Sequence, residues 1–349
     1  MTMIAYPPKP SPGDRVAVIS PSSGLPGLFP LPHELGLRRL REEFGLEPVE
    51  YPATRTMDST PAARAADVHA AFADPSIKAV IASIGGGDDQ ITVLPLLDRE
   101  LIRANPKPFF GLSDNTNLLA YLRNTGIVGY HGASVMVELG RPGAMHPQTA
   151  DSLRAALFTS GPYELRPAER FNDVDRDWAD PATFDREPPS RPGSGWSWVN
   201  ADRVVEGRTW GGCLEILGWL LMADREIARD PAEYDGGVLL LETSEELPSA
   251  EEVFRTLRNM GERGLLGRFS ALLMARPKTW SFACPNSPEE GARYAAEQRE
   301  AVLRAMRVYA PEATIVFDVD FGHTDPQVVI PYGGTVRVDG PARRVTVTY

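Results

Sequence analysis

The sequence has few cysteines and no long apolar run, and each shortage excludes a class of protein. Only Cys213 and Cys284 are present among 349 residues, so the disulfide framework of small secreted domains is excluded, as is a C-x-x-C zinc site. No stretch approaches the roughly 20 apolar residues of a membrane-spanning helix. The N-terminal residues lack the basic and apolar regions of a signal peptide. We therefore expect a cytoplasmic protein.

Positive charge is also scarce. The chain has 36 Lys and Arg against 47 Asp and Glu, which gives a formal net charge of −11 at pH 7. Nucleic acids and anionic membranes attract basic surfaces, so neither is expected as a partner. With 42% hydrophobic and 24% charged residues, the composition is that of a folded globular protein. The length suffices for about two domains.

The first half alternates short apolar runs with helical patterns. The four runs occupy residues 15–19, 78–84, 108–112 and 127–130. Strands that alternate with helices predict a parallel sheet, and the functional loops of such sheets lie at the carboxyl ends of the strands. We therefore expect residues 1–165 to form an α/β domain of the Rossmann-like or flavodoxin-like kind.

The second half has a different organisation. Residues 166–197 are rich in Pro, Asp and Arg without a sustained period, which indicates a linker or a loop that covers a site. Residues 198–349 mix helical segments with apolar runs, and Ser249 with Glu252 gives the capping-box pattern of a helix start. We expect a second, mixed α/β domain with a β-rich, barrel-like core.

A serine lies where the third predicted strand turns into a helix. The segment FGLSDN (110–115) places Ser113 where a nucleophile elbow would expose its hydroxyl beside a helix N-terminus. The second glycine of that motif is absent, because Asn115 stands in its place. A serine at a helix start is more often a cap. The motif alone therefore leaves both interpretations open.

Three consecutive glycines, Gly85, Gly86 and Gly87, follow the second predicted strand. Glycine lets backbone N–H groups approach a ligand closely, so this turn could form half of an oxyanion hole or hold a phosphate. A tight turn without function is an equal alternative. The turn matches neither the dinucleotide-binding pattern nor the P-loop, and we expect no cofactor.

Candidate acid–base residues lie farther along the chain. Glu242 ends the apolar run GVLLL, where a carboxylate can orient a histidine, whereas Glu245 and Glu246 are typical of a solvated loop. A serine nucleophile needs a nearby base. His131 and His323 both remain candidates for that base on sequence alone.

Acidic residues around His323 also allow a metal site. Asp318, Asp320 and Asp325 are carboxylates within a few residues of it. The chain has no H-E-x-x-H pattern, and two of these acids merely alternate along a predicted strand. We therefore expect no metal, although the alternative remains testable because a metal-dependent activity would disappear with a chelator.

Six segments carry a resemblance to a known family. They are PGDRVAVISPSSG, RAADVHAAFADPSIKAVIASIGGGDDQITVLPLLD, NPKPFFGLSDNTNLL, WGGCLEILGWLL, GGVLLLETSEELPSAEEVFRTL and DFGHTDPQVVIPYGG. In this order they resemble the LD-carboxypeptidase family of serine peptidases, and more closely its microcin C self-immunity branch. The resemblance implies a Ser-Glu-His catalytic set at Ser113, Glu242 and His323, and so prefers His323 to His131.

The resemblance also implies an oxyanion hole. Its donors would be the backbone N–H groups of Asp114 and Gly86, with Gly85 or Gly87 as alternatives that otherwise contact substrate. The implied reaction is acyl transfer through an acyl-enzyme, without a metal or cofactor. Family members are commonly homodimers, so we expect a homodimer with a small-molecule substrate.

Two substrates are compatible with the resemblance. A peptidyl or aminoacyl nucleotide is favoured, because Trp196, Trp198 and Trp210 could build an aromatic platform for a base, with core packing as the alternative. A murein tetrapeptide is the second candidate. Cys213 stands where the family usually has asparagine, with Glu215 nearby, and we expect both to contact substrate.

A different class of function is a small-molecule binding protein without catalysis. In that case the glycine turn would hold an anion, and replacing Ser113 would leave ligand affinity unchanged. Under either hypothesis residues 166–197 could close over the site as a lid.

Overall fold

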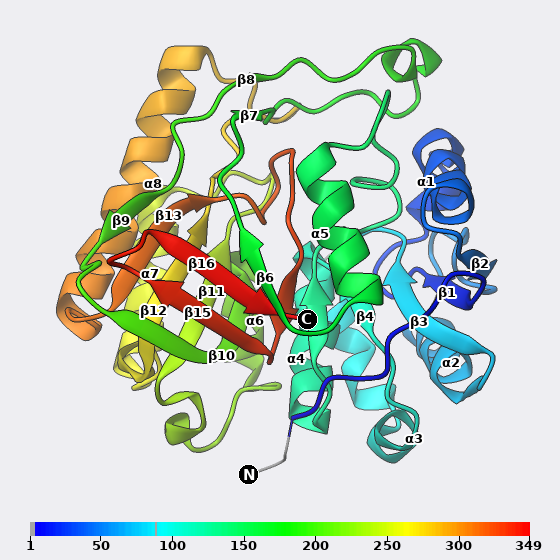
Figure 1. Ribbon diagram of the computed structural model, residues 1–349, viewed down its shortest axis with the longest axis horizontal. Helices are drawn as coiled ribbons and strands as arrows, with labels where there is room; N and C mark the ends of the chain where they lie inside the picture. Colours follow the sequence, from blue (N-terminus) through cyan, green and yellow to red (C-terminus); the bar gives the residue numbers. More distant parts are fainter. Residues whose placement is uncertain (1–3, 88) are drawn as a thin grey trace.

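The computed structural model describes residues 4–87 and 89–349, which form two large sheets side by side, with helices packed on them, and a small two-stranded sheet (Figure 1). The first sheet has the strand order β14-β5-β4-β3-β1-β2, parallel throughout except that β14 runs antiparallel to β5. Its strands are β1 (Arg15–Ile19), β2 (Glu47–Glu50), β3 (Ile77–Ala82), β4 (Phe109–Gly111), β5 (Gly129–His131) and β14 (Ile330–Tyr332). The predicted parallel sheet of the first half is confirmed.

Helices cover both faces of this sheet. They are α1 (Pro30–Glu42), α2 (Pro61–Ala73), α3 (Arg99–Ala104), α4 (Thr116–Thr125) and α5 (Pro147–Phe158). Along β1, Ala17 and Ile19 share a core with α2, α3 and α4, whereas Val16 and Val18 share one with α1 and α5. Alternate residues of a strand point to opposite faces, which explains why this run is apolar throughout.

The second sheet is mixed and has the order β6-β16-β15-β10-β11-β12-β13-β9. Its strands are β6 (Pro162–Leu165), β9 (Ser197–Val199), β10 (Val204–Cys213), β11 (Gly237–Glu242), β12 (Phe269–Ala275), β13 (Thr314–Val319), β15 (Thr335–Asp339) and β16 (Arg344–Thr348). The four central strands, β10 to β13, are parallel, and the outer pairings are antiparallel.

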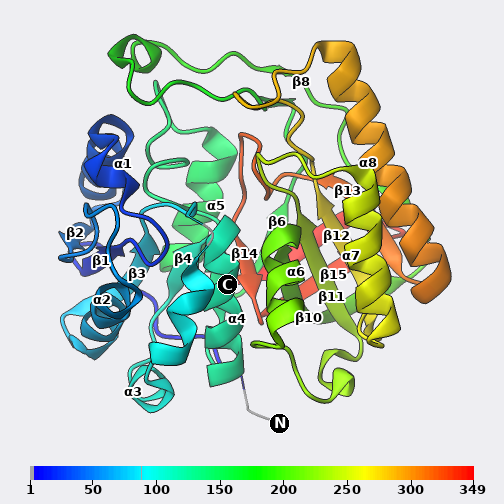
Figure 2. The same ribbon diagram turned by 180° about the vertical axis from the view of Figure 1, so that it is seen from behind.

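Three helices, α6 (Leu214–Ala223), α7 (Ala250–Glu262) and α8 (Pro288–Tyr309), cover one face of the second sheet (Figure 2). Their apolar residues join the core beneath α2 and α4, so each of the two cores runs through both halves. The halves also exchange strands, because β6 pairs with β16 and β14 pairs with β5. The relative position of the two sheets is thereby fixed by packing and by backbone hydrogen bonds.

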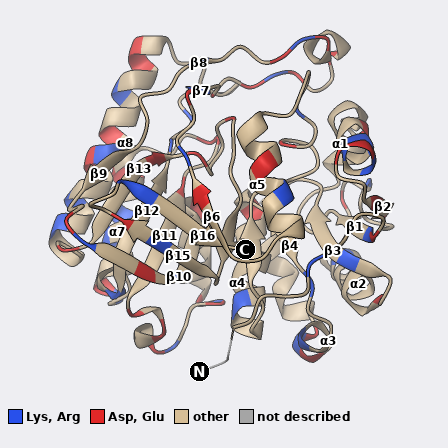
Figure 3. Ribbon diagram, viewed as in Figure 1, with Lys and Arg blue, Asp and Glu red and all other residues tan. Residues whose placement is uncertain are grey.

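One local prediction is confirmed. The capping box at Ser249 and Glu252 begins α7, as predicted. The segment 166–197 contains short strands, such as β7 (Arg170–Phe171) paired with β8 (Arg191–Pro192), and a short 3-10 helix at Pro181–Phe184. Charges of both signs are interspersed over both halves in the view of Figure 3. No helix within residues 4–87 and 89–349 is both long and apolar enough to cross a bilayer.

Candidate functional site

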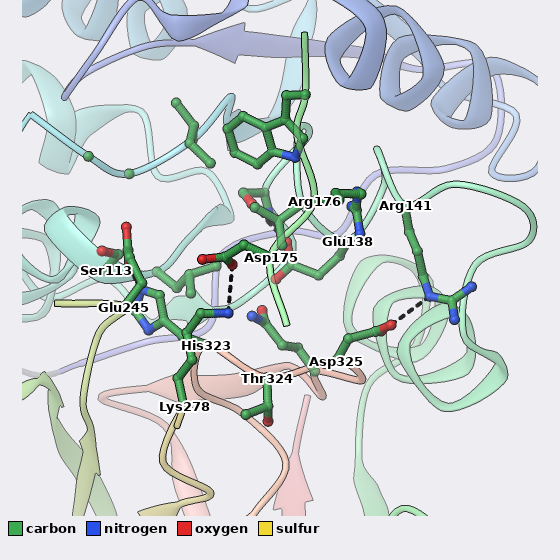
Figure 4. A pocket seen from close by; sticks show the side chains of 18 of the residues that line it. Ser113, Glu138, Arg141, Asp175, Arg176, Glu245, Lys278, His323, Thr324 and Asp325 are labelled. Carbon is green, nitrogen blue, oxygen red and sulfur yellow. Dashed lines mark hydrogen bonds and ion pairs between the residues drawn. The ribbon is translucent and has the colours of Figure 1, made fainter. Parts of the chain in front are cut away.

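A pocket of about 620 Å³ lies between the two halves, and loops that follow strands of both sheets line it (Figure 4). The first half contributes the glycine turn after β3 and the turn after β4. The second half contributes loops after β11 and β13, and the segment 172–178 adds another wall. The carboxyl ends of parallel strands thus supply much of the site, as expected for α/β sheets.

Ser113 enters this pocket from the turn between β4 and α4. It has φ +60°, in the left-handed region that a serine rarely adopts. The side-chain amide of Asn115 donates to the carbonyls of Ile84 and Leu112, both at 3.1 Å, and so stabilises the turn. A strained residue held by its surroundings is characteristic of a functional position, and this turn has the geometry of a nucleophile elbow.

The glycine turn packs directly against Ser113. A Cβ atom built on Gly85 would lie 2.8 Å from Cβ of Ser113, so only glycine permits this approach. Gly86 lines the pocket with φ +75°. Gly87 packs against Ser23 instead, because a Cβ atom built on Gly87 would lie 3.3 Å from Cβ of Ser23. Gly85 therefore packs against the serine, Gly86 lines the same pocket as the serine, and Gly87 lies outside the pocket lining.

Replacing Gly85 by alanine should displace Ser113 and lower turnover by roughly 10- to 100-fold, because small misplacements of a reacting group are costly. Steady-state kinetics with circular dichroism as a folding check would measure this. The matched control is Gly218→Ala in α6, where the built Cβ has nothing nearer than 3.9 Å. A Gly85→Ala enzyme as active as the control would show that the close approach is unimportant.

Glu242 and His323 make a short polar contact at the edge of the pocket. Oε2 of Glu242 accepts a hydrogen bond from Nδ1 of His323 at 2.5 Å, and Glu242 is completely buried at the end of β11. Burial alone would raise the pKa of Glu242, but His323 and His131 outweigh it and lower this pKa to about 2. A buried carboxylate that stays ionised can fix the tautomer of its histidine.

The two candidate histidines occupy different positions. His323 lines the pocket together with Ser113, whereas His131 is fully buried behind Glu242, with its Nε2 3.8 Å from Oε1 of that carboxylate. Of these two histidines, His323 is therefore the one that shares the pocket lining with Ser113.

Glu245 lines the pocket, although its position in the sequence is typical of a solvated loop. Its Oε2 lies 3.2 Å from Nε2 of His323, the nitrogen that a serine nucleophile would need. Among the described residues His323 makes no hydrogen bond with Ser113. Burial disfavours the imidazolium, yet Glu242, Glu245 and Glu215 outweigh it and raise the pKa of His323 to about 9.

Activity should therefore rise with pH as His323 loses its proton. Removing the Glu245 charge stabilises the neutral imidazole, so Glu245→Gln should move the acid limb of the kcat/KM profile to lower pH by about one unit. Profiles from pH 5 to 10 would measure the shift. The control is Glu246→Gln, which changes the adjacent residue outside the pocket lining. An unchanged limb in Glu245→Gln would contradict the role of the ion pair.

Cys213 and Glu215 lie beneath the pocket rather than in its lining. Cys213 is paired with Glu242 in the register of β10 and β11, and its backbone N–H donates to Oγ1 of Thr116 in α4 at 3.1 Å. Glu215 accepts from the backbone N–H and the hydroxyl of Ser244, at 2.9 and 2.7 Å. Burial raises the pKa of both groups. They support the loop after Glu242 and connect it to the helix after Ser113.

The predicted aromatic platform is not built from the expected tryptophans. Trp210 is 1% exposed and packs in the core against Tyr234 and Phe269, with ring centroids 4.9 and 5.9 Å away. Nε1 of Trp196 donates to Oδ2 of Asp320 at 2.9 Å, outside the pocket lining. Both indoles complete the packing of the second half.

Trp178 lines the pocket instead. It lies in the aperiodic segment after residue 166 and meets Phe29 edge to face, with ring centroids 5.8 Å apart. No period in that segment indicates where a side chain points, so the sequence could not select this tryptophan.

The acids considered as metal ligands are held in separate ion pairs. The pairs, with their N···O distances, are Asp318–Arg299 at 2.8 Å, Asp320–Arg276 at 3.1 Å and Asp325–Arg141 at 2.7 Å. In the part of the chain that the structure describes, no three His, Cys, Asp or Glu side chains are grouped so that they could hold a metal. Each of the three carboxylates near His323 in the sequence is thus paired with a different arginine.

Comparisons with known proteins agree with this architecture. The model of the LD-carboxypeptidase N-terminal domain matches residues 16–132, and that of the C-terminal domain matches residues 206–338. A putative carboxypeptidase of Streptomyces coelicolor is 30% identical over 98% of both chains. The microcin C7 self-immunity protein MccF of Escherichia coli is 25% identical over 82% of this chain and 78% of its own.

Solved structures share the fold. An MccF-like protein from Streptococcus pneumoniae in complex with AMP has a TM-score of 0.84 and 26% identity, and the match covers 96% of this chain and 98% of that one. MccF in complex with glutamyl sulfamoyl guanosine has a TM-score of 0.81 and 22% identity, and covers 100% and 99%. The two domain models together match most of the chain, and so the protein belongs to the LD-carboxypeptidase family.

Proposed function

We propose that the protein is a serine hydrolase in which Ser113 is the nucleophile, His323 the general base and Glu242 the group that orients His323. The observation that carries the proposal is the 2.5 Å contact between Glu242 and His323 in a pocket that Ser113 also lines. A serine hydroxyl is a weak nucleophile by itself and needs such a base.

The reaction begins when His323 takes the Ser113 proton at Nε2. For this step the Glu245 carboxylate has to leave the 3.2 Å contact that it makes with that nitrogen. Nδ1–H of His323 continues to donate to Glu242, which stabilises the imidazolium. Oγ of Ser113 bonds to the substrate carbonyl carbon as the carbonyl π electrons move to oxygen.

The resulting oxyanion would be stabilised by the backbone N–H groups of Asp114 and Gly86. Asp114 directly follows the nucleophile, and its buried carboxylate accepts from the backbone N–H of Gln90 at 3.1 Å and from Asn117 at 2.8 Å. These bonds hold the turn in place. The leaving group then departs with the proton from His323. Water next gives a proton to His323 and bonds to the acyl carbon, and the second oxyanion collapses as the bond to Oγ of Ser113 breaks and Oγ takes the proton back from His323.

The substrate that we propose is a peptidyl or aminoacyl nucleotide. Trp178 and Phe29 provide an aromatic wall on which a base can stack. Solved relatives hold AMP and glutamyl sulfamoyl guanosine. A murein tetrapeptide is the second candidate, because the family models that match are those of LD-carboxypeptidases.

Incubation with an aminoacyl-sulfamoyl adenosine and a murein tetrapeptide, followed by mass spectrometry of the products, separates these substrates. Cleavage of the nucleotide conjugate is the expected result. Cleavage of the tetrapeptide alone would instead assign the enzyme to cell-wall recycling.

Trp178→Ala should raise KM for the nucleotide conjugate by about 10-fold or more, since stacking of one base on an aromatic ring contributes about 1–3 kcal/mol. The effect should be small for the tetrapeptide. Trp198→Ala, at an indole outside the pocket lining, is the control for loss of an aromatic residue. Equal KM values for Trp178→Ala and wild type would contradict base stacking at this wall.

A further inference from the structure

The basic side chains of the pocket differ in how they are neutralised. Three Lys and Arg residues line it: Arg141, Arg176 and Lys278. Nε of Arg141 lies 2.7 Å from Asp325, and Nζ of Lys278 lies 2.6 Å from Asp175. In residues 4–87 and 89–349, Arg176 has no hydrogen bond or ion pair. It is thus the one basic group of the described lining without a partner.

Arg176 is also partly removed from water. Its Nε is buried without a hydrogen-bond partner, and burial lowers the pKa of its guanidinium to about 10, although Asp325 opposes the change. The group remains charged at neutral pH. A charge that is partly removed from water and has no ion pair is costly, because Asp325 offsets only part of its desolvation. An anion arriving in the pocket would remove that cost.

The backbone before Arg176 is fixed to the second half of the chain. Asn172 and Asp325 exchange two backbone hydrogen bonds of 2.7 and 2.8 Å. The Asp173 carboxylate accepts from the Thr279 hydroxyl at 2.5 Å, and the Lys278–Asp175 ion pair follows along the chain. Arg176 therefore emerges from an anchored segment, and Figure 4 shows it among the labelled residues of the pocket that contains Ser113.

We infer that Arg176 binds an anionic group of the substrate, either a carboxylate or a phosphate, in the same pocket as Ser113. The planar guanidinium can donate two parallel hydrogen bonds to either oxyanion. The inference rests on the proposed function, because it assigns a recognition role within that site. It predicts that the natural substrate carries such a group in addition to the bond that is cleaved.

Isothermal titration of the Ser113→Ala protein, which should bind without turnover, tests the inference. Two probe pairs differ only in the anion: AMP against adenosine, and a murein tetrapeptide against its C-terminal carboxamide. Each pair is titrated into Ser113→Ala alone and into Ser113→Ala combined with Arg176→Gln. The matched control is Arg186→Gln, an exposed arginine of the same segment outside the pocket lining.

At least one anionic probe should bind about 10-fold or more tightly than its neutral counterpart, and Arg176→Gln should abolish this preference while Arg186→Gln preserves it. A preference for AMP identifies a phosphate, and a preference for the free peptide identifies a carboxylate. If no anionic probe binds more tightly than its counterpart, or if Arg176→Gln keeps the preference, the inference is wrong.

These outcomes are separable from those for the proposed function. If the Arg176→Gln enzyme hydrolyses its substrate and keeps the wild-type preference for the anionic probe, the inference about Arg176 is wrong and the proposed function stands. An Arg176-dependent anion preference in a protein whose hydrolysis survives Ser113→Ala would overturn the proposed nucleophile and retain the anion site.

Discussion

Replacing Ser113 by alanine should lower hydrolysis by about four orders of magnitude or more, because the acyl-enzyme can no longer form. Alanine is the mildest replacement, since it removes only the hydroxyl and tolerates φ +60° about as well as serine. Single-turnover kinetics on the nucleotide conjugate would measure the loss. Ser23→Ala, beside the glycine turn but outside the pocket lining, is the control and should retain activity.

The same variant separates catalysis from simple binding. A protein that only binds its ligand would keep both its affinity and its biological effect after Ser113→Ala. An enzyme would keep affinity and lose turnover. Unchanged hydrolysis by Ser113→Ala would show that another residue is the nucleophile and would contradict the proposed mechanism.

Glu242→Gln should lower kcat/KM by about three to four orders of magnitude. The amide preserves volume in a position that is completely buried, but its NH2 group would donate to Nδ1 of His323. That hydrogen bond favours the tautomer with the proton on Nε2, which then cannot accept the Ser113 proton. The loss of negative charge also lowers the His323 pKa, so the acid limb of the pH profile should move to lower pH.

Glu245→Gln is the matched control, because it makes the same chemical change at the other carboxylate in contact with His323. Its maximal rate should stay close to that of wild type, with only the pH profile moved. Equal losses of maximal rate in Glu242→Gln and Glu245→Gln would show that the two carboxylates have the same role, contrary to the assignment.

Much of the fold could be predicted from local patterns. The apolar run RVAVI is β1 with the predicted bounds, and GVLLL extends by one residue to become β11, because strands buried on both faces are continuously apolar. The helix α8 was not predicted, although Ser287 and Glu290 form its capping box. The pairing of β14 with β5 depends on residues 199 positions apart in sequence, from His131 to Ile330, and has no local signal.

The residues of the candidate site likewise differ in whether a local sequence pattern indicated them. Ser113 and Glu242 could be named as candidates because each follows or ends a buried strand, and the family resemblance assigned their roles and favoured His323 over His131. Trp178 and Arg176 come from a segment without a period, and the distant elements that anchor this segment determine where they lie. The role of Glu245 depends on a 3.2 Å contact with a loop far away in sequence.

The most direct test of the central claim is intact-mass measurement after reaction with a fluorophosphonate, followed by peptide mapping. The proposed mechanism predicts one adduct, on Ser113, that is absent from Ser113→Ala and forms at least about 100-fold more slowly in His323→Ala. An adduct on another residue, or equal labelling of His323→Ala and wild type, would contradict the claim that His323 activates Ser113.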